Sequence, residues 1–370
     1  MELYRPSEHE PLTEAAWDDS RVRAGVAAIV ADAEAALVDG AWPVHPRDGG
    51  DLPVPPTTLY LGAAGMVWAL HRLGSSLDLG AVVARVRERY VEHPDFAPDL
   101  ADPRSLLMGE SGILLVARVV GSAAADDALL LARIRDNVAN EFWELMWGSA
   151  GTMLAARAAG FDDEWRESAR RLWAEWDEET DLWTQLLYGR RRQLLGPVHG
   201  ATGNIHALRG YDDDALRERT TRLLGRHALR DGELVNWPPG PTSRPDEIRV
   251  QWCHGAPGIV ATVGDLLPLD LARGGAELTW CAGPLAKGCG LCHGTAGNGY
   301  ALLKLFALTG DELWLDRARR FAVHALEQVE RARAEHGRGR YSLWTGDVGA
   351  ALFAQACLDG DARVPTIDVW

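Results

Sequence analysis

A pair of glycines separated by two residues occurs seven times along the chain, each time directly before an apolar segment. The first glycines of these pairs are Gly62, Gly109, Gly148, Gly200, Gly255, Gly294 and Gly346. Spacings of 39 to 55 residues suit a repeated pair of helices. The chain has 39 glycines in 370 residues, about 13 more than average composition gives, and the pairs contain 14. We therefore interpret the surplus as a device that starts one helix per repeat.

Two kinds of helix are predicted within each repeat. Segments after the glycine pairs, such as residues 112–117, are apolar nearly all round, which is typical of a helix buried on most faces. Stretches between them, such as residues 21–39, carry apolar residues on one face only. Strand-like alternation with hairpin turns is absent, so an all-β fold is disfavoured. The sequence predicts an all-α fold, and its periodicity allows either an open solenoid or a closed two-layer toroid.

The repeat also predicts the domain organisation. Length alone would suggest two or three domains, but the repeat continues through three proline-rich stretches, which we expect to be surface loops. These stretches are residues 42–56, 94–103 and 237–245. We therefore expect residues 21–370 to form a single domain of seven repeats, preceded by a leader segment at residues 1–20.

Charge and composition exclude several classes of function. The net charge of −15 gives no electrostatic basis for binding nucleic acid. No apolar run reaches the ~18–20 residues of a membrane span, and the N-terminus lacks the pattern of a signal peptide. Five cysteines in a long chain without an export signal indicate core thiols, metal ligands or redox chemistry in a reducing compartment. We expect a cytoplasmic protein.

Cysteine and histidine stand directly before the glycine pairs of the later repeats. Cys253 and His254 precede one pair, and Cys292 and His293 precede the next, 39 residues further along. A curved array of repeats brings these positions together, because all lie at the same end of the inner helices. Two thiolates and one imidazole suit Zn²⁺ with an open fourth position, where an incoming thiol can lose its proton and stay nucleophilic.

The other cysteines require separate interpretation. Cys289, Cys292 and His293 also form a Cys-x-x-Cys-His pattern, which is typical of c-type haem attachment. Haem is disfavoured, because no export signal is present and the repeat already explains the position of His293. We interpret Cys281 and Cys289 as spare thiols and Cys357 as a core residue.

Two segments carry a family resemblance. Residues 249–258 read Arg-Val-Gln-Trp-Cys-His-Gly-Ala-Pro-Gly, and residues 290–298 read Gly-Leu-Cys-His-Gly-Thr-Ala-Gly-Asn. With the repeats from about residue 55 onward, the chain resembles the lanthionine synthetase C-like family, closest to its eukaryotic-type branch. The resemblance implies a closed α/α toroid of seven inner and seven outer helices. It also implies Zn²⁺ bound by Cys253, Cys292 and His293.

The resemblance extends to four further positions. His199 matches the family's proposed acid/base histidine, and Arg249 matches an active-site arginine that would stabilise an enolate-like charge. Glu144 stands where many cyclases have aspartate, with an exposed helix acid as the competing interpretation. His254 either orients this set or forms a hydrogen bond with the backbone.

The implied chemistry is the addition of a thiol to dehydroalanine or dehydrobutyrine in a dehydrated peptide, which gives a thioether. A thiol from a peptide cysteine makes the enzyme a lanthionine cyclase, which requires a separate dehydratase or kinase–lyase. Glutathione as the thiol makes it a glutathione-adding enzyme. Residues 190–192, three arginines, are either a solvated loop or a site for carboxylates of either substrate. A zinc-stabilised, non-catalytic peptide-binding scaffold is the remaining alternative.

Overall fold

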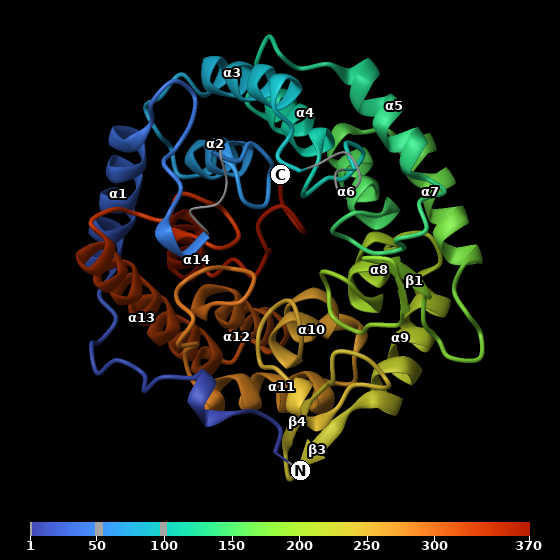
Figure 1. Ribbon diagram of the computed structural model, residues 1–370. Helices are drawn as coiled ribbons and strands as arrows, with labels where there is room; N and C mark the ends of the chain where they lie inside the picture. Colours follow the sequence, from blue (N-terminus) through green and yellow to red (C-terminus); the bar gives the residue numbers. More distant parts are fainter. Residues whose placement is uncertain (1, 49–54, 97–101) are drawn as a thin grey trace.

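The computed structural model describes residues 2–48, 55–96 and 102–370, and these form two concentric rings of α-helices (Figure 1). The inner helices are α2 (Ala63–Arg72), α4 (Glu110–Val119), α6 (Ser149–Ala159), α8 (Ala201–Ala207), α10 (Ala256–Val263), α12 (Thr295–Thr309) and α14 (Asp347–Asp359). The outer helices are α1 (Asp19–Ala36), α3 (Leu79–Glu92), α5 (Asp127–Asn137), α7 (Asp162–Ala174), α9 (Asp213–His227), α11 (Leu269–Ala282) and α13 (Glu312–His336). Over the described residues, the predicted α/α toroid of seven inner and seven outer helices is confirmed.

Inner and outer helices differ in burial and in how they begin. In α4, every residue from Glu110 to Ala117 is buried, whereas α9 buries a single face. Several outer helices begin after an aspartate whose side chain accepts a backbone N–H, as Asp126 and Asp212 do. The first glycine of each pair is instead the residue that precedes an inner helix.

The second glycine of every pair lies against the backbone carbonyl oxygen of the residue six positions earlier. A Cβ atom on Gly297 would come within 1.7 Å of such an oxygen, far inside any real contact. Each of these glycines also lies against a side chain of the neighbouring repeat. Gly65 of the first repeat lies in the same way against Leu343 of the last repeat. A Cβ atom on Gly65 would come within 2.8 Å of the Cβ atom of Leu343. One contact repeated around the ring therefore closes it.

Main-chain hydrogen bonds connect the loops that precede the inner helices. The backbone N–H of Cys253 donates to the carbonyl oxygen of Cys292 at 3.0 Å, and that of Cys292 donates to Trp344 at 2.8 Å. The N–H of Trp344 in turn donates to Tyr60 at 3.4 Å, which joins the last repeat to the first. All four residues lie two positions before the first glycine of a pair. These loops form one rim of the toroid.

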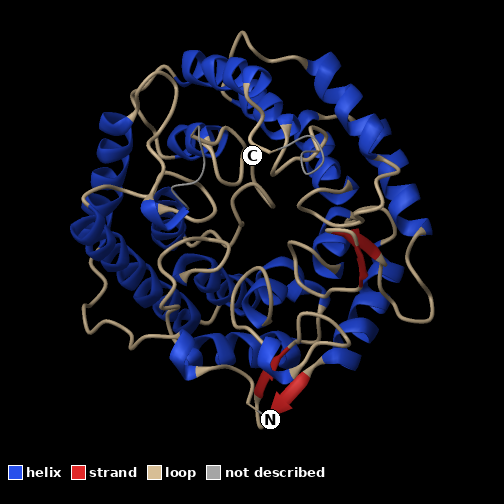
Figure 2. Cartoon of the chain, in the orientation of Figure 1, coloured by secondary structure: helices blue, strands red, loops and turns tan. Residues whose placement is uncertain are grey.

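Two short antiparallel hairpins interrupt the helical pattern (Figure 2). They are β1 (Gln185–Leu187) with β2 (Arg190–Arg192), and β3 (Leu229–Asp231) with β4 (Leu234–Asn236). The expectation that hairpins are absent is therefore wrong for these two loops, because strands of three residues are too short to show alternation. The three arginines form an exposed strand rather than an irregular loop.

The proline-rich stretches are not simply surface loops. Trp42 and Trp237 within them are buried, whereas residues 49–54 and 97–101 lie outside the described residues.

Before α1, Glu10 accepts hydrogen bonds from His324 at 2.6 Å and from Gln328 at 2.8 Å, both on α13. None of the described helices combines the length and the apolar character that a membrane span requires.

Candidate active site

Two thiols and one imidazole meet on the rim. The Sγ atoms of Cys253 and Cys292 and a ring nitrogen of His293 all lie within 4.8 Å of one another. Ligand bonds of about 2.0–2.3 Å place the donors of a tetrahedral zinc site roughly 3–4 Å apart, so small side-chain movements complete such a site. Cys253 and Cys292 are buried and His293 is partly exposed, which leaves one side of the cluster accessible. The donor set and its geometry fit a metal ion with an open position.

Two neutral side chains donate hydrogen bonds to the sulfur atoms. The Gln251 amide donates to Cys253 at 3.2 Å, and the Tyr60 hydroxyl donates to Cys292. Burial and the adjacent thiols raise the pKa of Tyr60, so its hydroxyl keeps its proton. Hydrogen bonds from Cys253, His293 and Tyr60 lower the pKa of Cys292. The Cys292 thiol is therefore the first of the two to ionise.

A second cluster joins Glu144 to His199. The Nδ1 atom of His199 lies 2.7 Å from the Glu144 carboxylate and donates its hydrogen to it, because a carboxylate can only accept. Burial alone would lower the pKa of His199, but the hydrogen bond and charge of Glu144 outweigh it, and the pKa is raised. Nε2 is left as the nitrogen that can act on a substrate. The pair has the geometry of a general acid/base.

Glu144 is fixed in place by its own loop. Its side chain is fully buried, so the interpretation as an exposed helix acid is wrong. The carboxylate accepts backbone N–H groups from Met146 at 3.0 Å and Gly148 at 3.1 Å. Trp143, directly before it, adopts a φ of 42°, which is uncommon for a bulky residue. The backbone of this loop is therefore strained at Trp143, directly before the carboxylate that the loop holds in a buried position.

His254 lines the same cavity as His199 but has a different charge state. Burial, with the positive charges of His199 and Arg249 nearby, lowers the pKa of His254 to about 4. It is therefore neutral at pH 7, whereas His199 is shifted toward its charged form. Such a separation of pKa values between neighbouring groups is typical of acid/base sites.

The structure does not bring the Arg249 guanidinium into contact with the cysteines or with His199. Its Nη1 donates to the carbonyl oxygens of Asp246 and Ile248, both at 2.9 Å, and its Nε lies 3.8 Å from Glu8. Arg249 thus ties the loop before Cys253 to the N-terminal segment. Its role on the substrate stays a prediction.

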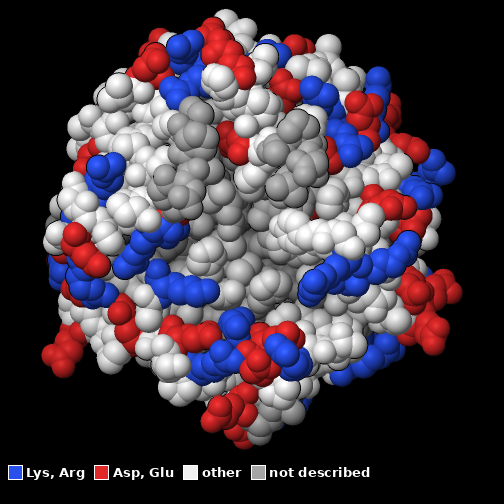
Figure 3. Space-filling view, viewed as in Figure 1, with Lys and Arg blue, Asp and Glu red and all other residues white. Residues whose placement is uncertain are grey.

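The cavity containing both histidines has a volume of about 510 Å³ and adjoins a second cavity of about 550 Å³. Arg190 and Arg192 line both, and Arg191 lines the second. Within the described residues these three arginines form no ion pair. On this face the molecule is hollowed at its centre, and basic side chains gather around the hollow (Figure 3).

The toroid and its rim of cysteines and histidines define a protein of the lanthionine-cyclase type of fold. Residues 53–369 match the lanthionine synthetase C-like protein family, and the chain belongs to that family. Its structure is similar to that of nisin cyclase, with a TM-score of 0.62 at 16% identity, covering 91% of this chain and 94% of that one.

Two curated relatives match parts of the chain. The glutathione S-transferase LANCL1 of Danio rerio is 41% identical over 114 residues, which are 29% of this chain and 26% of that protein. The LanC-like protein GCL1 of Arabidopsis thaliana is 35% identical over 192 residues, or 48% of this chain and 44% of that protein. The chain therefore matches less than half the length of either relative.

Sequence reasoning missed Tyr60 and Gln251 as partners of the cysteines. A signal for Tyr60 was present, because it stands two residues before Gly62, in the same register as both cysteines. Only a closed ring makes the first repeat a neighbour of the last. The shared register therefore predicts a contact between Tyr60 and the cysteines only when it is combined with ring closure. Gln251 carries no comparable signal.

Proposed function

We propose that this protein adds a thiol to dehydroalanine or dehydrobutyrine residues of a peptide and so forms a thioether. The observation that carries the proposal is the contact of the partly buried His199 with the fully buried Glu144, 2.7 Å between Nδ1 and Oε2, on the same rim as Cys253, Cys292 and His293. A scaffold that only binds peptide needs the metal ligands but has no use for an imidazole paired with a buried carboxylate. This pair therefore favours an enzyme over a scaffold.

Cys253, Cys292 and His293 would be the ligands of Zn²⁺, with two thiolates balancing its charge. When bound, zinc supplies a Lewis acid that lets a substrate thiol lose its proton near neutral pH. The five cysteines are all free thiols, which suits a reducing compartment such as the cytoplasm.

The reaction balances without an oxidant or a leaving group. The substrate thiolate forms a bond with the β-carbon, and the π electron pair moves toward the α-carbon and its carbonyl oxygen. His199 Nε2 then gives a proton to the α-carbon and regains the one that the thiol lost. Glu144 stabilises the imidazolium, and neutral His254 lies beside it without competing for that proton.

The source of the thiol separates two versions of this function. A cysteine in the same peptide gives lanthionine or methyllanthionine, and a separate dehydratase must then act first. Glutathione gives an intermolecular adduct, and the relative named glutathione S-transferase supports this version. Arg190, Arg191 and Arg192 beside the cavity would suit the two carboxylates of glutathione.

Metal content and product mass test the proposal. Purified protein is expected to contain about one zinc per chain, and Cys292→Ala is expected to lose it; absence of zinc from the wild type overturns the metal site. Incubation with a dehydroalanine peptide plus glutathione, or with a dehydrated peptide that contains cysteine, separates the two versions by product mass. If His199→Ala forms thioethers at the wild-type rate, that result contradicts the acid/base role assigned to the pair.

A further inference from the structure

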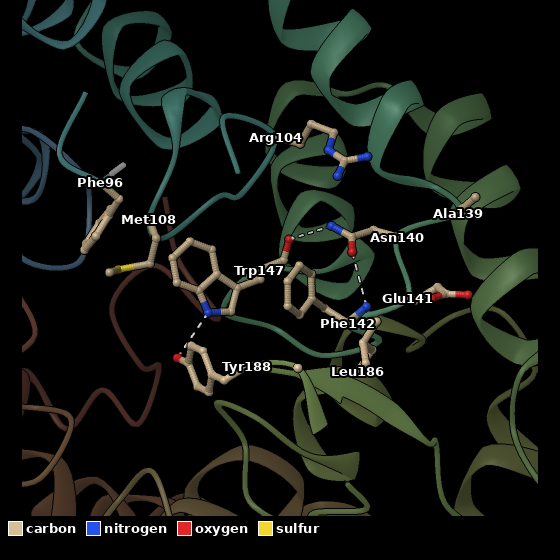
Figure 4. Close-up of a pocket in the computed structure, with 11 residues that line it drawn as sticks. Phe96, Arg104, Met108, Ala139, Asn140, Glu141, Phe142, Trp147, Leu186 and Tyr188 are labelled. Carbon is tan, nitrogen blue, oxygen red and sulfur yellow. Dashed lines mark hydrogen bonds between the residues drawn. The ribbon is translucent and has the colours of Figure 1, made fainter. Parts of the chain in front are cut away.

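A third cavity, of about 660 Å³, lies beside the acid/base pair and differs from the others in chemistry. Apolar and aromatic side chains form most of its wall (Figure 4). They are Phe96, Met108, Phe142, Trp147, Leu186 and Tyr188. Arg104, Asn140 and Glu141 contribute polar groups to the lining. An apolar cavity with a few polar groups at its edge is the usual form of a site for an apolar ligand group.

Trp147 and Tyr188 connect this cavity to the catalytic pair. The Trp147 indole donates to the Tyr188 hydroxyl at 3.3 Å (Figure 4). The backbone N–H of Trp147 donates to the Glu144 carboxylate. The Tyr188 ring lies edge-on to the His199 ring, with 6.2 Å between centroids. Tyr188 also lines the cavity that contains His199. A group bound against Tyr188 is therefore within about two residues of extended peptide from the acid/base histidine.

Tyr188 occupies a position that tyrosine does not favour. It has a φ of 51° and is followed by Gly189 with a φ of 72°, and two positive φ angles in succession are the geometry of a type I′ hairpin turn. Asparagine and glycine are the residues that such a turn prefers. Tyr188 as a whole residue is also 63% exposed, so burial in the free protein does not compensate for the strained backbone. Strain of this kind at a cavity points to a binding role.

We propose that the aromatic cavity binds an apolar side chain of the peptide, one or two residues from the dehydrated residue. The inference rests on the proposed function and adds a substrate class to it: peptides with an aromatic or branched aliphatic residue beside the reacting one. The exposed Leu186 and Tyr188 would close over that side chain and remove it from water. Glutathione has no large apolar side chain, so this cavity selects the peptide and not the thiol donor.

Binding of two unreactive peptides to the purified protein tests the proposal without catalysis. Both carry alanine in place of dehydroalanine, and they differ only in having phenylalanine or serine next to it. Titration calorimetry is expected to show a Kd for the phenylalanine peptide at least about tenfold lower, as burial of an aromatic side chain implies. Tyr188→Asn and Leu186→Gln are each expected to reduce that difference to about threefold or less.

Tyr211→Asn is the matched control, because it makes the same change at a half-exposed tyrosine outside the cavity and should keep the tenfold preference. Tyr188→Asn is expected to unfold at the same temperature as the wild type or higher, since asparagine relieves the turn. Equal affinity for the two peptides, or a preference that survives both cavity variants, overturns the proposal. Product mass with dehydroalanine substrates is a separate measurement, so a protein that forms thioethers without side-chain preference refutes the cavity and not the function.

Discussion

The Nδ1 atom of His199 donates its hydrogen to Glu144 across 2.7 Å, and the two residues belong to adjacent repeats, 55 positions apart. The carboxylate is fully buried and its loop supplies three backbone N–H groups to it. The carboxylate cannot turn away without leaving these buried N–H groups unsatisfied, which is costly, so it stays aimed at His199. The contact therefore sets both the tautomer and the charge of His199.

Glu144→Gln should weaken the acid function of His199. The wild-type imidazolium exists below its raised pKa, so activity that needs it falls as pH rises through that value. Without the carboxylate charge the pKa of His199 drops, and the fall occurs at lower pH. We expect kcat at pH 8 to decrease about tenfold or more. The measurement is the pH profile of thioether formation for both proteins.

Glu110→Gln provides the comparison for that variant. Glu110 is also buried, and it accepts from Arg133 at 2.8 Å, away from the cavity. Its neutralisation should lower stability and leave the pH profile of the reaction unchanged. A profile that moves equally in both variants would mean that the shift reflects a weakened fold and not the state of His199.

Tyr60→Phe should weaken metal binding while preserving the aromatic stacking of residue 60. The Tyr60 ring stacks on Trp344 with centroids 6.0 Å apart, and phenylalanine keeps that contact. The lost hydroxyl removes a hydrogen bond to Cys292. Loss of such an outer-sphere donor is expected to reduce zinc affinity about 10–100-fold, measured by competition with a chromogenic chelator. Tyr90→Phe, a buried tyrosine on α3, should bind zinc like the wild type.

The repeat allowed the fold to be predicted in detail, because the second glycine of each pair lies where the local backbone leaves no room for a Cβ atom. A Cβ on Gly112 would come within 2.2 Å of the Leu106 carbonyl oxygen, and contacts of this kind recur at all seven second glycines. Ring closure followed only from the family resemblance, since it depends on contacts between the first and last repeats. Gly65 against Leu343 carries no sequence signal of its own.

The candidate site was predictable where its residues share the register of the repeat. Cys253 and Cys292 stand at equivalent places in consecutive repeats, and they come together with His293 as expected. Tyr188 lies on a hairpin outside the repeat, and its role depends on a positive φ angle that composition and periodicity do not reveal. For Arg249, the sequence predicted a functional residue at this position. It did not predict that loop carbonyl oxygens would bind the guanidinium.

Gly112→Ala should destabilise the toroid without touching the catalytic residues. Besides the Leu106 carbonyl, the new methyl group would lie 2.9 Å from the Leu59 side chain of the preceding repeat. Backbone on one side cannot move away freely, so we expect a loss of at least about 2 kcal/mol in the free energy of unfolding. Urea denaturation measures it, and wild-type stability would refute the close-approach explanation of the glycine pairs.

Gly225→Ala is the matched substitution for that experiment. Gly225 lies inside α9, and no atom outside its own helix backbone lies within 4 Å of the Cβ position. Alanine has the higher helix propensity, so stability should rise by about 0.5–1 kcal/mol. Opposite signs for the two alanine substitutions separate a steric demand from a general preference for glycine.

Asp265→Asn should lower stability in a way that depends on pH. Burial alone would raise the pKa of Asp265, but hydrogen bonds from Arg209 at 2.7 Å and Lys304 at 3.0 Å hold it well below its usual range. Through Asp265, which follows α10, the ion pairs connect Arg209, just after α8, to Lys304 within α12. Their loss leaves two partly buried cations together, and we expect a cost of about 1.5–3 kcal/mol at pH 7.

The sign of that pH dependence follows from the lowered pKa. The stabilisation is fully present above the unfolded value of about 3.9 and is lost as pH falls through the folded pKa, where the wild-type carboxyl also becomes neutral. Urea denaturation from pH 7 to pH 2 should therefore show the gap between wild type and variant closing below about pH 4. Asp270→Asn, which removes an exposed pair with Arg230 at 3.3 Å, should cost less than about 1 kcal/mol throughout. A gap for Asp265→Asn that stays constant down to pH 2 would contradict the ionic origin assigned to it.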